Sequence, residues 1–451
     1  MRSRIPIVSL GLAFLMPFFP FQLAHQLHGK ENAQANISSS WKKAKDAVDK
    51  LWKEPSSETA AEFYISISTG KGIENDKTEL LDYIFGPNPK MVSSSMRVGS
   101  ITMEMLSGDI YAARSEIRLL GFVYSGWQRP PSVTSDAAEL ILAHLGMLVR
   151  VNPAIFLKAC QAEQKDPYLR DNGFPVGFVS DIMKEIKTRA SYELEMRKES
   201  LRSVEAPELR LVRDECLKVL EREIQEIGSD SPDSEKQEER PAVDPRARIK
   251  WVIAEMQRRP SPENMKRVLD LYSEVPRENL LDIILTLVPP PEAQRRIWAT
   301  PLYLVRREAL CGNEYAVEVL FHALVQCFGL ESMQIYSMLS NFILEKPALF
   351  IEKLAKYSIF LDSIKDIGES GQAAPSSYIE RICAYTSSFE LPGINWDVIL
   401  KRRIDTLAAL NMPENQELID RCIRAIQKEL KDYIYKESGA SGATVPTLPD
   451  E

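Results

Sequence analysis

Histidine and cysteine are scarce in this 451-residue chain, which has 4 His and 6 Cys. A zinc site needs three or four converging ligands, and catalysis by Ser or Cys usually needs a His base. His144 and His322 lie among apolar neighbours in segments that we expect to be helical. We therefore expect both to be satisfied within their helices, and we expect no metal site and no cofactor.

The common motifs of catalysis and ligand binding are also missing. The chain has no P-loop, HExxH motif, EF-hand loop, CxxC pair or GxSxG turn. Gly70-Lys71-Gly72 lacks the third glycine and the preceding buried strand of a phosphate-binding loop, so we expect an ordinary loop. Asp82 and Asp282 stand beside Leu-Leu pairs, where we expect surface or capping roles. The sequence thus assigns no catalytic residue.

Basic residues are fewer than acidic ones. The chain has 56 Lys and Arg against 64 Asp and Glu, a formal net charge of −8, and no dense basic stretch. Such a chain repels a phosphate backbone. We therefore expect no nucleic-acid partner.

Long apolar runs are absent except at the N-terminus, where residues 5–24 carry no charge. Arg2 and Arg4 precede this run, and Ala33-Gln34-Ala35 follows it as a small-x-small site. We expect residues 1–35 to be a signal peptide that is cleaved near Ala35, which would export the chain to the periplasm or the exterior. The alternative is a membrane anchor formed by residues 5–24, but the mature chain should contain no transmembrane domain.

An internal duplication is the main pattern in the sequence. Five blocks recur in the same order in the two halves of the chain. Extra residues fall near 126–131 in the first half and near 368–372 in the second, where loops would tolerate them. The matched blocks begin at Pro55 and Pro260, at Glu79 and Asn279, at Gly108 and Gly312, at Ile141 and Ile335, and at Pro207 and Pro413.

The duplication predicts two homologous lobes, at residues 40–227 and 245–436. The segment 228–244 between them is polar and acidic, so we expect a flexible linker. The tail, residues 437–451, is rich in Gly, Ser, Ala and Pro, and we expect it to be disordered.

The apolar residues recur with a helical period almost throughout. In 214–227 they trace a stripe at three- and four-residue spacing. Phe63–Ile67 alternates like a strand, but its matched segment, Val268–Tyr272, has a helical pattern, so we expect both to be helical. The fold class should be all-α, with two tandem lobes of about seven or eight helices each, packed like an α-solenoid or an orthogonal bundle.

A local resemblance accompanies this pattern. The block Gly312-Asn313-Glu314-Tyr315-Ala316-Val317-Glu318-Val319-Leu320, with its counterpart at 108–113, resembles the opening of a HEAT-type repeat helix. The likeness covers one helix pair in each lobe. It implies at most an α-solenoid-like packing.

A proline marks a helix boundary at the same place in each half. Pro153 and Pro347 each follow a strongly apolar segment, and proline favours the first position of a new helix. Phe156 and Phe350 lie three residues further on. We expect both rings to be buried between two consecutive helices that form the core of each lobe.

The cysteines allow two interpretations. Cys216 and Cys422 occupy matched positions on apolar stripes, where a thiol acts as a small buried hydrophobe. An exported chain, however, meets oxidising conditions, so the pairs Cys160–Cys216 and Cys383–Cys422 are candidates for disulfides. Cys311 and Cys327 should lie at opposite ends of one helix, too far apart to pair.

Two functions fit these observations. The first is an exported interaction or scaffold protein that binds a protein or peptide partner, because helical repeats bind such ligands in grooves. The second is a carboxylate-dependent hydrolase or lyase acting on an envelope glycan. Glu369-Ser370-Gly371-Gln372 resembles the Glu-Ser turn of lytic transglycosylases, but it lies in a loop of one copy only. Trp127 is either an exposed recognition residue or the anchor of a loop.

Overall fold

A computed structural model describes most of the chain beyond Ser38. Residues 39–451 form one compact unit. The expected signal region, the loops around Gly70, Trp127 and Glu369, and residues 438–451 lie outside the described residues. The described residues are 39–69, 79–81, 83–85, 96–125, 134–166, 169, 176–180, 190–230, 244–288, 300–326, 330–363, 377–386 and 395–437.

All regular structure in these ranges is helical, so the all-α class is confirmed. Phe63–Ile67 belongs to a helix, as its matched segment indicated. We refer to residues 39–230 as the first half. Its helices are α1 (Ser39–Lys53), α2 (Ser57–Thr69), α4 (Met96–Leu106), α5 (Ile110–Ser125), α6 (Thr134–Val151), α7 (Pro153–Glu163), η3 (Val176–Val179), α9 (Ala190–Arg202), η5 (Pro207–Leu209) and α10 (Arg210–Asp230).

The second half, residues 244–437, contains ten α-helices among its described residues, more than the seven or eight expected. None of the described helices has the length and apolar content needed to cross a bilayer. The helices are α11 (Pro245–Arg258), α12 (Pro262–Glu274), η6 (Arg277–Asn279), α13 (Leu280–Leu287), α14 (Pro301–Leu310), α15 (Glu314–Gln326), α16 (Leu330–Glu345), α17 (Pro347–Ser363), α18 (Tyr378–Ala384), α19 (Trp396–Ala408), η8 (Pro413–Asn415) and α20 (Gln416–Glu437).

Helix starts follow from local sequence chemistry. Ser261 caps α12 by accepting a hydrogen bond from the Asn264 N–H, with Pro262 at the first helical position, as predicted. Ser377 begins α18 with a full capping box to Glu380. These side chains satisfy backbone donors that have no partner inside the helix.

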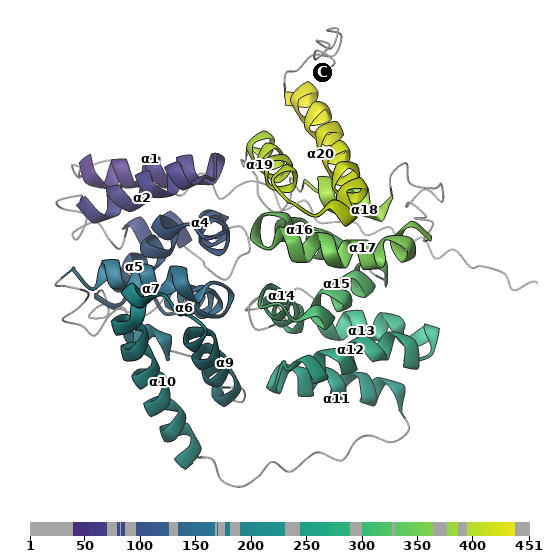
Figure 1. The fold of residues 1–451 in the computed structure, drawn as a ribbon, viewed down its shortest axis with the longest axis horizontal. Coiled ribbons are helices and arrows are strands. Elements are labelled where there is room, and N and C mark those ends of the chain that lie inside the picture. Colours follow the sequence, from purple (N-terminus) through teal and green to yellow (C-terminus); the bar gives the residue numbers. More distant parts are fainter. Residues whose placement is uncertain are drawn as a thin grey trace, which may run out of the picture. The chain divides into compact units, whose positions relative to one another are not determined.

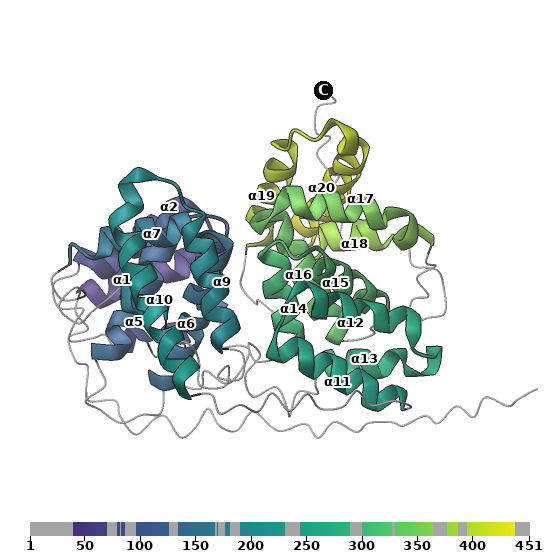
Figure 2. The same ribbon diagram turned by 60° about the horizontal axis from the view of Figure 1, so that its bottom comes forward.

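Each half arranges its helices in two layers, as Figures 1 and 2 show. In the first half, α1, α4, α6 and α9 form one layer through successive contacts, and α2, α5, α7 and α10 form the other. In the second half the layers are α11, α14, α16, α19 and α12, α15, α17, α20. We call the layer that begins with α1 or α11 the inner layer, and its companion the outer layer. The common order supports the proposed duplication.

A matched glycine precedes the central outer helix of each half. Gly108 has φ 101° and lies two residues before α5, while Gly312 has φ 90° and lies two residues before α15. Residues with a Cβ rarely adopt this left-handed conformation. The glycines therefore let the chain turn sharply from α4 into α5 and from α14 into α15.

A buried arginine occupies the same place in both halves. Arg197 and Arg403 precede Pro207 and Pro413 by equal intervals, and both are nearly inaccessible. Arg197 donates to the Val179 carbonyl at 2.9 Å. Arg403 donates to the Tyr385 carbonyl at 2.8 Å, and burial lowers its pKa to about 10. Each guanidinium thus satisfies carbonyls of the short segment beside the last helix.

The expected proline-started helix pair is present in both halves. α6 ends at Val151 and α7 begins at Pro153, while α16 ends at Glu345 and α17 begins at Pro347. The Phe156 ring is 1 % exposed and the Phe350 ring is fully buried. Burial of these rings excludes a large apolar area from water and stabilises the pair.

The two halves meet through their inner layers by reciprocal contacts. Arg402 on α19 binds Glu104 on α4, and Arg307 on α14 binds Glu193 on α9. In the matched numbering, α4 corresponds to α14 and α9 to α19. The first half contributes α4 to one contact, with α19, and α9 to the other, with α14. The same kind of contact therefore occurs twice, as in an interface with twofold symmetry.

The corners between the first two helices of each half repeat this reciprocity. The Pro55 carbonyl accepts a hydrogen bond from Arg402 of the second half at 2.7 Å. Its matched carbonyl, that of Pro260, accepts one from Tyr192 of the first half at 3.3 Å. Apolar side chains also join the halves, because Trp52 and Met103 pack against Leu344, Trp396 and Ile399.

Candidate functional site

The described residues contain no group of three or more His, Cys, Asp and Glu that could hold a metal ion. His144 is 7 % exposed, and its Nδ1 lies 2.8 Å from Thr102 Oγ1 and 3.3 Å from Glu116 Oε1. Thr102 also donates to Glu116 at 2.8 Å. The buried ring of His144 is therefore satisfied, as expected from the sequence, by partners on α4 and α5.

Several buried carboxylates are held by arginines. Glu193 and Glu308 are each 2 % exposed, and both contact Arg307. Arg150 adds two bonds to Glu308, at 2.6 and 2.8 Å. A general acid needs a proton at neutral pH and access to substrate. We call Arg150, Glu193, Arg307 and Glu308 the interface ion cluster, and its chemistry is that of a charge-paired contact between the halves.

Two further buried carboxylates have a raised pKa. Burial raises the pKa of Glu104 and of Glu345, while Arg402 and Arg306 respectively oppose the shift. Glu104 bonds Arg402 across the halves, and Glu345 bonds Arg306 at 2.5 Å. Neither forms a pair with a second carboxylate beside an open pocket, which a glycosidase requires.

A small pocket lies between α11 and α12. Its volume is about 180 Å³, below the range typical of sites for drug-sized ligands. Arg248 and Glu274 within it form an ion pair. None of the buried carboxylates described above lines it. The lining residues are Arg248, Trp251, Val252, Arg267, Asp270 and Glu274.

Four rings meet on the outer layer of the second half. We call Tyr272, His322, Tyr357 and Phe360 the ring cluster. His322 on α15 lies at its centre, with ring centroids 5.2 Å from Tyr272, 5.8 Å from Tyr357 and 5.3 Å from Phe360. These separations, with one stacked, one tilted and one edge-on ring pair, are typical of favourable aromatic contacts.

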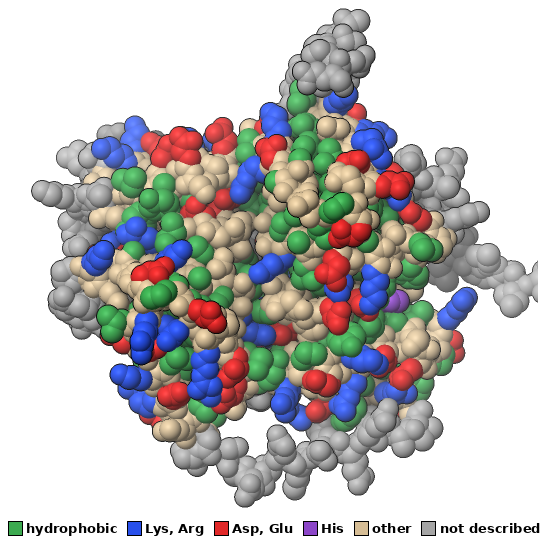
Figure 3. All heavy atoms as spheres, in the orientation of Figure 1, with side chains coloured by type: hydrophobic (Ala, Val, Ile, Leu, Met, Phe, Trp, Pro, Cys, Tyr) green, Lys and Arg blue, Asp and Glu red, His purple; other side chains and the backbone are tan. Residues whose placement is uncertain are grey.

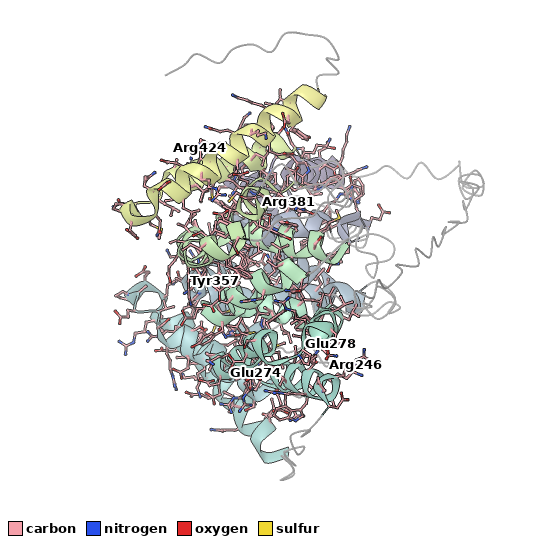
Figure 4. All side chains as sticks on the ribbon, turned by 90° about the vertical axis from the view of Figure 1, so that its right-hand side faces the viewer. Arg246, Glu274, Glu278, Tyr357, Arg381 and Arg424 are labelled. Carbon is pink, nitrogen blue, oxygen red and sulfur yellow. The ribbon has the colours of Figure 1, made fainter. Side chains whose placement is uncertain are left out.

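The ring cluster is half-buried and reaches the surface of the second half. All four side chains are of intermediate exposure, and Ile359 on the same helix as Tyr357 and Phe360 is 85 % exposed. In Figure 4 Tyr357 lies on this outer side, between Arg381 of α18 and Glu274 of α12. The second half thus offers partly exposed ring surface, and α17 also carries an almost fully exposed aliphatic side chain.

A buried carboxylate, that of Glu318, contacts the ring cluster. Glu318 is 4 % exposed and accepts a hydrogen bond from Tyr357 Oη at 2.6 Å. It also pairs with Lys356 at 2.5 Å. Burial raises the pKa of Tyr357, and the bond to Glu318 adds to this, so the phenol stays protonated. Burial lowers the pKa of His322, which Glu318 partly opposes, so its ring is neutral at pH 7.

The matched positions of the first half carry different chemistry. Arg118 follows Gly108 at the same interval as His322 follows Gly312, and Glu163 follows Pro153 as Tyr357 follows Pro347. Arg118 binds Glu163 at 2.8 Å and Asp166 at 3.0 Å. Tyr64 and Arg114 complete the coordination of Glu163. At these matched positions the first half forms ion pairs, whereas the second half has the half-buried rings of His322 and Tyr357.

The structure brings together few of the residues singled out from the sequence. Asp282 accepts bonds from Asn279 and Arg246, which is a surface role. Cys216 and Cys422 are fully buried. Cys311 ends α14 rather than beginning the helix expected to hold Cys327, because Gly312 turns the chain there. Asp82, Trp127, Gly70–Gly72 and Glu369–Gln372 lie outside the described residues.

Sequence reasoning missed the ring cluster as a unit. His322 was assigned to a helix with apolar neighbours, but its aromatic partners come from two other helices. The only local signal was the spacing of Tyr357 and Phe360, which are three residues apart on one helix face. Comparison of the chain with known protein families, curated proteins and solved structures finds no match.

Charge is evenly distributed on the face shown in Figure 3. Basic and acidic side chains are interspersed there with apolar ones, rather than gathered by sign. Nucleic-acid binding relies on a basic patch or stripe. This face therefore lacks the electrostatic pattern of a nucleic-acid interface.

Proposed function

We propose that the chain is an interaction protein that binds a protein or peptide partner through the ring cluster of its second half. The observation that carries the proposal is the contrast between matched outer layers. Glu163 of the first half is sealed by two arginines and a tyrosine, whereas Tyr357 and its neighbours remain half-exposed and Ile359 on the same helix as Tyr357 faces solvent.

The chemistry of the cluster favours an apolar anchor on the partner. Tyrosine and other aromatic residues are enriched at protein interfaces, and a few buried anchors carry most of the binding energy. Ile359 is poorly covered by its own protein, so covering it with an apolar side chain releases water without breaking a hydrogen bond. Lys356 at the edge supplies a polar rim.

The carboxylate-dependent hydrolase receives less support. It needs two carboxylates about 5–9.5 Å apart on either side of a substrate cleft. The buried carboxylates of Glu104, Glu193 and Glu308 are instead bonded to arginines where the two halves meet. The interaction role therefore remains the proposal.

The proposal can be tested before the partner is identified. A photo-reactive benzoylphenylalanine replaces Ile359 in one variant and Leu211 in a matched control, because Leu211 is 81 % exposed on α10 of the first half. Irradiation in the source cells should give a discrete protein adduct from position 359 only. The adduct's partner is then identified by mass spectrometry and purified.

Binding of the purified partner gives the quantitative test. Ile359→Asp places a charge on the apolar contact, so the Kd should rise by about tenfold or more, equivalent to about 1.4 kcal/mol. Leu211→Asp should leave the Kd within about twofold of the wild type. Equal Kd values for the two variants, or the same adducts from both positions, would refute the assignment of the surface.

A further inference from the structure

Two thiols face each other inside the second half. Cys383 lies on α18 and Cys422 on α20, and their Sγ atoms are 2.8 Å apart. Both side chains are fully buried. A disulfide requires an Sγ–Sγ distance of about 2.05 Å, so the two sulfurs need to approach by less than about 1 Å.

The surrounding contacts hold both cysteines in place. α18 packs against α20, α16 and α17. Arg403 donates to the Cys383 carbonyl at 3.4 Å and to the Tyr385 carbonyl at 2.8 Å, which fixes the end of α18. Arg421, next to Cys422, donates to Ser377 Oγ at 2.7 Å, which fixes the start of α18. Both ends of α18 are therefore bound to neighbouring helices while its thiol points at α20.

The first half provides an internal comparison. Cys216 occupies the position matched to Cys422, and both are fully buried. The second cysteine of the first half, Cys160, lies on α7 rather than on the segment matched to α18. Cys160 and Cys216 make no sulfur contact comparable to that of Cys383 and Cys422 among the described side chains.

We propose that Cys383 and Cys422 are a disulfide-forming pair that joins α18 to the C-terminal helix α20. The reaction is thiol–disulfide exchange with a small-molecule or protein disulfide. A thiolate of the pair attacks that disulfide, the resulting mixed disulfide is attacked by the second cysteine, and the oxidant leaves as two thiols. Two S–H bonds of the protein are exchanged for one S–S bond.

Burial determines when this reaction takes place. Burial raises the pKa of the Cys383 thiol, and the contact with Cys422 adds to this. The thiolate is the reactive form, so the folded pair reacts slowly with either oxidants or reductants. The bond therefore forms during folding or transient opening of α18, and it then resists reduction. This inference does not depend on the proposed binding role.

The test maps the bond in the full-length wild-type chain. The protein is refolded in a buffer of oxidised and reduced glutathione, quenched in acid, denatured, and alkylated without reduction. Four of the six cysteines should be alkylated. A digest should yield one linked peptide pair that contains Cys383 and Cys422. Reduction before alkylation should label all six.

Matched variants separate this pair from other links. Cys216→Ala should retain the Cys383–Cys422 link, whereas Cys422→Ala should leave all five remaining cysteines alkylated. Reduction should lower the unfolding temperature of the wild type by several degrees and leave that of Cys422→Ala unchanged. Alkylation of all six cysteines in the oxidised wild type, or a link through Cys160 or Cys216 in its place, would overturn the proposal.

Discussion

Replacing Glu308 with glutamine should destabilise the chain strongly, because it unbalances the interface ion cluster. Glu308 receives two bonds from Arg150, at 2.6 and 2.8 Å, and one from Arg307 at 2.8 Å. All of these side chains are 8 % exposed or less. In Glu308→Gln, two buried guanidinium groups remain with Glu193 as their only carboxylate in the cluster.

The size of the effect follows from burial. Removal of one partner from a buried ion pair typically costs about 3–5 kcal/mol, because the remaining charge is left uncompensated. For a cooperative unit of this size, that loss corresponds to about 4–6 °C in the unfolding temperature. Asp270→Asn is the matched control, since the Lys266–Asp270 pair is 52 % and 38 % exposed. It should cost less than about 1 kcal/mol.

A double-mutant cycle isolates the pair from other effects. Arg150→Gln combined with Glu308→Gln removes one charge of each sign and leaves Arg307 paired with Glu193. The double variant should therefore be more stable than the sum of the single losses predicts, by about 1–3 kcal/mol. Circular-dichroism melts and urea titrations measure all four proteins. A loss in Glu308→Gln no larger than that in Asp270→Asn would refute the reasoning.

Three further predictions concern other parts of the chain. Phe350→Ala should lower the free energy of unfolding in urea by about 3–5 kcal/mol. Ile359→Ala on the same helix, where the side chain is 85 % exposed, should leave that free energy within about 0.5 kcal/mol of the wild type. Similar losses in the two variants would contradict the core role of Phe350. Burial lowers the pKa of His322, so the neutral ring stabilises the fold above pH 6.5, and this stability is lost as the pH falls through the folded-state pKa. His322→Phe should therefore flatten the pH dependence of the urea midpoint below pH 6.5. An unchanged slope would contradict the burial of the ring. We also propose that residues 1–35 direct export, so mass spectrometry of the exported protein should find Asn36 as the first residue; recovery of residues 1–35 with the membrane fraction would favour the anchor.

The sequence predicted the elements of this fold better than their interactions. Helix starts at Pro153, Pro262 and Pro347 follow from short-range rules about proline and capping, and the burial of Phe156 and Phe350 follows from their position after those starts. α18 has only seven residues, which are too few to establish a helical period.

The candidate surface depends on contacts that no local pattern encodes. Tyr272, His322 and Tyr357 lie on three helices and meet only after these helices pack. The same holds for Arg403, which is 1 % exposed and donates to the carbonyls of Cys383 and Tyr385. By contrast, the Cys383–Cys422 pair was a candidate from the sequence, because an exported chain meets oxidising conditions in which cysteines form disulfides.

The reciprocal contacts between the halves have a consequence for assembly. Each half uses its α4-type and α9-type helices to contact the other half. The same two surfaces can therefore pair between two chains as well as within one chain. In such a dimer the first half of each molecule packs against the second half of the other molecule. Every ion pair of the interface is then preserved. Refolding at high concentration should therefore yield a domain-swapped dimer, whose abundance is governed by the polar segment between Asp230 and Asp244.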